Sequence, residues 1–131
     1  MKRAGEKMYS YVNIEKELTP EFRAALKSMK DANSIADLFI ETIFKLLKKI
    51  KPELNLKYEN DIVFAPEAEN NKWSFEKKLS EKFAEEITHS DLESIVNRFA
   101  VETFKWYEHI GHSDESRVFF KGNPGEIIHG R

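Results

Sequence analysis

The sequence predicts an α-rich α+β fold of about four helices with a small antiparallel β element. Apolar residues recur at helical spacing over two long segments, 34–50 and 91–110, and more briefly over 19–31 and 74–88. Two apolar runs also flank a polar turn between residues 54 and 65, which is the pattern of a hairpin. With 131 residues, the chain is long enough for one hydrophobic core but not for two.

The first predicted helix, 19–31, begins at a Thr-Pro-Glu sequence. Thr19 supplies an N-cap hydroxyl. Pro20 suits the first helical position, because the backbone N–H that it lacks would have no partner there. The apolar residues that follow make one narrow stripe: Phe22, Ala25, Leu26 and Met29. We therefore expect residues 1–18 to form an N-terminal arm in front of the helix.

The second predicted helix, 34–50, is expected to be mostly buried. Ser34 begins it with Asp37 three residues on, an imperfect capping box, and Pro52 ends it because the ring disfavours helical backbone at the preceding residue. Apolar residues occupy most of its circumference. Only one strip is left for water: Asp37, Glu41, Lys45 and Lys48.

The segment after Pro66 has two interpretations over residues 72–79. Trp73 and Phe75 alternate as in a strand, whereas an apolar residue every four positions from Phe75 onward favours a helix over 74–88. We prefer the helix.

The last predicted helix, 91–110, has the clearest signals. Ser90 and Glu93 form a capping box, and Gly111 suits the position after the C-cap. Its apolar seam alternates steps of four and three: Leu92, Val96, Phe99, Thr103, Trp106 and Ile110. Residues 117–121 are a candidate for one more strand. We expect a single globular domain over 1–121, followed by a mobile tail at 122–131.

Composition excludes several classes of function. The chain has no Cys, so it forms no disulfide, thiol nucleophile or Cys-ligated metal site. Its 21 basic and 23 acidic side chains are interspersed and give a net charge of −2, which favours neither nucleic acid nor an anionic membrane. No apolar segment has the length of a membrane span. We expect a soluble cytoplasmic protein.

One cluster has the composition of a metal site. His109 and His112 lie near a predicted helix end with Asp114 close by, and imidazole and carboxylate groups suit zinc, iron or manganese. Glu86 and His89 form a second, weaker pair. The simpler interpretation is that these are surface residues, with His109 placed at the negative end of a helix dipole.

Four lysines form a candidate nucleic-acid site: Lys45, Lys48, Lys49 and Lys51. Such a cluster could contact phosphates. Lysines also collect in the last turn of a helix, because the dipole favours them there and their stems cover apolar surface. We prefer this second interpretation. The sequence contains no nucleotide-binding or nucleophile motif, so we predict neither a cofactor nor a catalytic site.

The predicted function is therefore a non-enzymatic protein–protein interaction or adaptor module that self-associates. Segments 34–50 and 91–110 carry more apolar surface than the other predicted elements can cover. A second copy related by a twofold axis would supply the missing layer, so we predict a homodimer. The alternatives are a metal-binding protein or metal-dependent enzyme, and a nucleic-acid accessory protein.

Overall fold

The computed structural model describes residues 9–110 and 120–121. It confirms the α-rich α+β class, with six helical segments in this part of the chain where about four were predicted. In chain order the elements are α1 (Val12–Lys27), α2 (Ala32–Ile50), the 3-10 helix η1 (Leu56–Asp61), β1 (Ile62–Phe64), β2 (Trp73–Phe75), α3 (Lys77–Lys82), α4 (Ala84–His89), α5 (Leu92–His109) and β3 (Phe120–Lys121).

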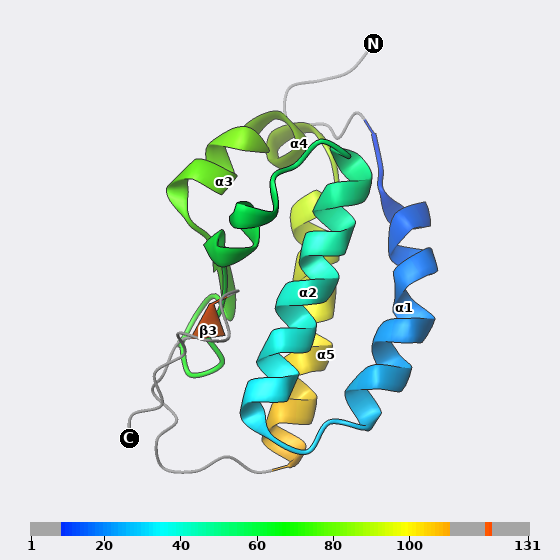
Figure 1. Cartoon of the computed structure of the whole chain (residues 1–131), viewed down its shortest axis with the longest axis vertical. Helices are drawn as coiled ribbons and strands as arrows, with labels where there is room; N and C mark the ends of the chain where they lie inside the picture. Colours follow the sequence, from blue (N-terminus) through cyan, green and yellow to red (C-terminus); the bar gives the residue numbers. More distant parts are fainter. Residues whose placement is uncertain (1–8, 111–119, 122–131) are drawn as a thin grey trace.

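Three long helices form the body of the molecule (Figure 1). Helices α1 and α5 run in the same direction, and α2 runs opposite to both and packs against both. The antiparallel sheet, in the order β2-β1-β3, lies against α2. The short helices α3 and α4 sit at the end of the bundle where α1 and α5 begin (Figure 1).

Helix α2 is the centre of the core, as predicted. Phe39 on α2 packs against Phe64 of β1 with ring centroids 5.1 Å apart, and Phe64 in turn contacts Tyr107 of α5 at 6.4 Å. On the other side, Phe22 of α1 meets the edge of Phe99 of α5 at 4.9 Å. The apolar faces of α2 are thus covered by α1, α5 and the sheet of the same chain. For α2, the shortage of cover that motivated the predicted dimer is therefore absent.

Helix α1 begins earlier than predicted. It starts at Val12 rather than at Thr19, and Pro20 lies inside it. The stripe of Phe22 and Leu26 continues backward through Leu18, which is also buried, so burial favours the longer helix. Pro20 itself is exposed. Its ring has no backbone N–H, so burial of the stripe outweighs the loss of one helical hydrogen bond. Part of the predicted N-terminal arm is therefore helix.

The predicted hairpin over 54–65 is wrong. Residues 56–61 form η1, begun by Asn55, whose side chain accepts a hydrogen bond from the amide of Lys57 at 2.9 Å. Strand β1 pairs instead with β2, so the strand interpretation of Trp73 and Phe75 is correct. The predicted helix 74–88 is correct only from Lys77 onward, where the chain is helical but is divided into α3 and α4 by a break at Phe83.

Helix α5 lies close to its predicted bounds, but two details differ. Its N-cap is Asp91, not Ser90, although the Ser90 hydroxyl accepts from the amide of Leu92 at 3.0 Å. Trp106 was predicted in the buried seam and is only half-buried, whereas Tyr107 is buried. The apolar seam therefore turns away from Trp106 at the end of the helix.

Only part of the predicted C-terminal region can be compared with the structure. Phe120 and Lys121 form β3 and pair with β1, which confirms the candidate strand at these two positions. Residues 117–119 and the tail 122–131 lie outside the described residues. In the part of the chain that the structure describes, no helix is long and apolar enough to cross a membrane. The domain bounds and the cytoplasmic location stay predictions.

Candidate functional site

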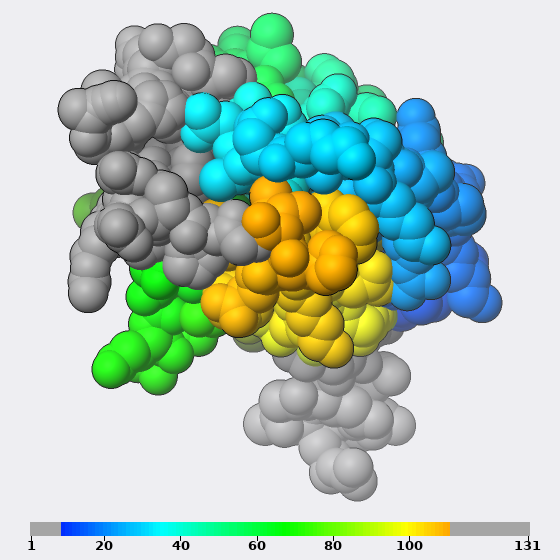
Figure 2. Space-filling view, turned by 90° about the horizontal axis from the view of Figure 1, so that it is seen from below, coloured from blue at the N-terminus to red at the C-terminus, as the bar shows by residue number. Residues whose placement is uncertain are grey.

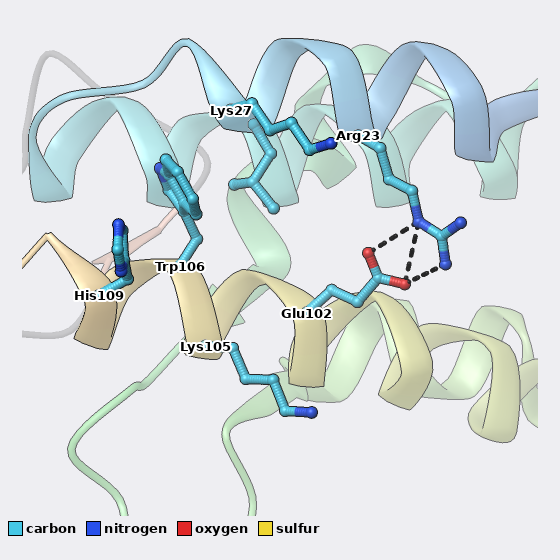
Figure 3. Close-up of a pocket in the computed structure, with 7 residues that line it drawn as sticks. Arg23, Lys27, Glu102, Lys105, Trp106 and His109 are labelled. Atoms are coloured by element: carbon cyan, nitrogen blue, oxygen red, sulfur yellow. Dashed lines mark hydrogen bonds and ion pairs between the residues drawn. The ribbon is translucent and has the colours of Figure 1, made fainter.

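An open groove lies between the C-terminal halves of α1 and α5 (Figure 3). We call it the α1/α5 groove; its volume is about 480 Å³. Figure 2 looks at this end of the molecule and shows the end of α5 in orange beside the blue residues of α1. The lining residues are Arg23, Leu26 and Lys27 of α1 and Glu102, Lys105, Trp106 and His109 of α5.

The apolar part of the groove is formed by Leu26 and Trp106. The Trp106 indole donates a hydrogen bond from Nε1 to the backbone oxygen of Met29, at 3.1 Å. The ring of His109 lies over it, with centroids 4.7 Å apart and planes tilted by 31°. Because Trp106 is held from two sides, it presents a preorganised aromatic surface that loses little side-chain entropy on contact with a ligand.

One end of the groove is closed by an ion pair between the two helices. Arg23 donates from Nε to Oε1 of Glu102 at 3.0 Å and from one terminal nitrogen to Oε2 at 2.6 Å. Figure 3 shows the guanidinium and the carboxylate facing each other across the gap. The hydrogen bonds to Glu102 raise the pKa of Arg23 further above its usual range.

The remaining charged groups of the groove are cationic. Lys27 reaches along α1 toward Arg23, and Lys105 extends outward from α5 (Figure 3). Neither lysine forms an ion pair with any residue in the described ranges. Three cationic side chains therefore line the groove against the single carboxylate of Glu102, in a chain whose net charge is −2.

The predicted metal cluster is only partly visible. His109 lies exposed at the end of the groove, whereas His112 and Asp114 lie outside the described residues. Among the residues that the structure describes, no group of three or more His, Asp and Glu side chains could hold a metal ion. Glu86, of the second candidate pair, forms an ion pair with Lys51 at 3.2 Å.

Three of the four lysines in the predicted cluster are bound to other groups of the protein. Lys48 donates from Nζ to the backbone oxygens of Pro52 and Leu54 at 3.1 and 3.0 Å. Lys49 pairs with Glu17 of α1 at 3.5 Å.

Lys51 also has partners, since it combines its pairing to Glu86 with a position over the ring of Phe83. Lys45, Lys48 and Lys49 do border a hollow of about 320 Å³ beside Phe44. Of the four lysines, only Lys45 makes no hydrogen bond or ion pair to another described residue. The charge available for phosphate contacts is therefore small.

The sequence did not indicate the α1/α5 groove as a site. Its residues come from two helices that are 79 positions apart where Arg23 meets Glu102. Comparison of the chain with protein-family models, with curated proteins and with solved structures gives no match. The function of the groove has to be argued from its own chemistry.

Proposed function

We propose that this chain is a non-enzymatic protein–protein interaction module whose α1/α5 groove docks an acidic segment of a partner protein. The observation that carries the proposal is the combination of an apolar floor with a cationic rim. Trp and Arg are the side chains that most often dominate binding energy at protein interfaces, and both line this groove. A segment that places an apolar side chain between carboxylates would match it.

Each part of the groove has a role in such a complex. Leu26 and Trp106 offer an apolar surface to one side chain of the segment. Lys27 and Lys105 attract its carboxylates, and this attraction raises the rate of association more than it slows dissociation. The groove is open to solvent between the two helices, so a segment of polypeptide can reach its lining residues from outside.

An acidic polypeptide fits the molecule better than a nucleic acid. Nucleic-acid binding requires cations along a path of several phosphates. Beyond the groove, Lys48, Lys49 and Lys51 are engaged by carbonyl oxygens or carboxylates. The net charge of −2 also opposes a polyanion at long range, whereas a short acidic segment contacts only the cationic rim.

The proposal is tested with a labelled peptide that carries one Leu flanked by Glu and Asp residues. We expect the double variant Lys27→Glu/Lys105→Glu to weaken its binding by about tenfold or more, because attraction becomes repulsion. The matched control is Lys77→Glu/Lys78→Glu. It makes the same change in net charge on exposed residues of α3, at the other end of the molecule.

Fluorescence anisotropy measures both affinities. Equal loss in the two double variants would contradict the proposal, because it would show a response to net charge alone. Tighter binding of a single-stranded oligonucleotide of the same length would also contradict it, and would assign the groove to nucleic acid.

Homodimerisation is the second candidate, and one observation favours it. Val101 is 40% exposed on α5, and Asn97, one turn before it, accepts a hydrogen bond from the half-buried Trp73. Because α2 is covered within the chain, we propose that any dimer uses this side of α5. Light scattering should then give twice the 15.4 kDa mass of one chain, and Val101→Glu should restore the single mass. A single mass for the unaltered protein would refute this candidate.

A further inference from the structure

We propose that Arg23 is the residue that selects a carboxylate in the α1/α5 groove, and that Glu102 occupies Arg23 in the unbound protein as an internal competitor. This inference rests on the docking function proposed above and adds to it. It makes Glu102 a stand-in for the carboxylate of the partner. Binding of the acidic segment would then exchange one carboxylate for another on the same guanidinium.

The geometry of the pair supports the exchange. Two parallel N–H groups of Arg23 point at one carboxylate, with the distances of 3.0 and 2.6 Å given above. Nε lies 3.2 Å from the second oxygen as well. This planar fork matches a carboxylate in a way that an ammonium ion does not. While Glu102 holds this edge, no second carboxylate can use the same two N–H groups.

The pair is also accessible and easily separated. The side chains of Arg23 and Glu102 are 58% and 37% exposed. Exposed ion pairs contribute little to stability, because water and salt compete for both groups. Both residues line the groove, so a carboxylate held near Lys27 is within the same space as the guanidinium. Exchange therefore costs little of the binding free energy.

A second Arg–Glu pair between the same helices provides a matched control. Arg98 of α5 donates from Nε and a terminal nitrogen to Glu15 of α1 at 2.8 and 2.7 Å. This fork is equivalent in chemistry, but neither residue lines the groove. Glu15→Gln therefore removes one charge and one fork, as Glu102→Gln does, without uncovering a ligand for the partner.

The experiment measures the affinity of the Leu-containing acidic peptide for four proteins. Relative to the unaltered chain, Glu102→Gln should bind about fivefold tighter, because Arg23 is released and the groove loses its only carboxylate. Arg23→Lys should bind about fivefold more weakly although the charge is kept, because the fork is lost. Glu15→Gln should stay within about twofold of the unaltered chain.

A second readout separates fork recognition from general attraction. Arg23→Lys keeps the charge, so its weaker binding should persist at every salt concentration, because the lost interaction is the fork and not the long-range attraction. Affinities of the two proteins that become equal at high salt would overturn the selecting role of Arg23.

The two proposals fail in different ways. If Lys27→Glu/Lys105→Glu weakens binding but Glu102→Gln does not strengthen it, the groove docks the segment and the competitor role of Glu102 is overturned. The competitor role is also overturned if Glu15→Gln strengthens binding as much as Glu102→Gln does. If the lysine variant has no effect on binding, the docking function itself is overturned, and the competitor role with it.

Discussion

The two ends of the interface between α1 and α5 use the same ion pair in different surroundings. At the upper end, Arg98 binds Glu15, whose side chain is only 15% exposed. Close to it, Asp91 accepts hydrogen bonds from the hydroxyl of Ser10 and the amide of Tyr11. At the lower end, Arg23 and Glu102 are both more than one third exposed and border a groove.

The difference teaches that an Arg–Glu fork has no fixed role. Where the carboxylate is largely buried, as at Glu15, the fork joins two helices. Asp91 beside it holds Ser10 and Tyr11. Where both side chains are exposed, as at Arg23 and Glu102, the carboxylate of a ligand can reach the guanidinium. The aromatic ring of Trp106 beside the open pair adds a contact surface that the closed end does not offer.

The largest expected effect tests the core between the two ends. Phe99→Ala should lower the free energy of unfolding by about 3–5 kcal/mol, because the ring is buried against Phe22. Trp106→Ala should cost about 1–2 kcal/mol, since the indole is half-buried, yet it should abolish peptide binding. Urea denaturation measures the loss of unfolding free energy in each variant. An equal loss of stability would place Trp106 in the core and contradict its role at the groove.

The next effect tests the closed end. Asp91→Ala removes the acceptor for Ser10 and Tyr11 and should cost about 1–2 kcal/mol of unfolding free energy. Peptide affinity should be unchanged, because Asp91 does not line the groove. A loss of affinity with intact stability would show that the two ends are coupled and that the comparison does not hold.

A smaller effect compares the two ion pairs directly. Glu15→Gln should destabilise the fold by about 0.5–1 kcal/mol and Glu102→Gln by less than about 0.5 kcal/mol, because only Glu15 is shielded from water. Thermal unfolding at low and high salt resolves the difference. A larger loss for Glu102→Gln would mean that the open pair is a structural link.

The sequence was sufficient for elements whose signals are local. The periodicity that defined 34–50 and 91–110 places α2 and α5 within two residues at each end. Prediction from the sequence failed where a local rule for helix ends competed with burial of apolar residues. Pro20 favours a helix start, but the apolar stripe through Leu18 extends the helix past it. The partner of β1 was missed because strand register depends on residues beyond the turn.

The groove could not be predicted, although part of its polar strip was visible. Glu102, Lys105 and His109 recur along one side of α5 in the sequence. Nothing local shows that α1 runs parallel to this strip, or that Met29 offers its carbonyl to the Trp106 indole. An aromatic residue at helical spacing is usually core, but the half-buried Trp106 bonds to the backbone just after the end of α1.

The docking function is tested most directly by the two tryptophan indoles. The chain has two Trp residues, and each donates from Nε1: Trp106 to Met29 in the groove, and Trp73 to the side-chain oxygen of Asn97 outside it. In one NMR titration with the acidic peptide, the Trp106 indole signal should move saturably while that of Trp73 stays in place. Movement of Trp73 alone, or of neither signal, would contradict docking in the α1/α5 groove.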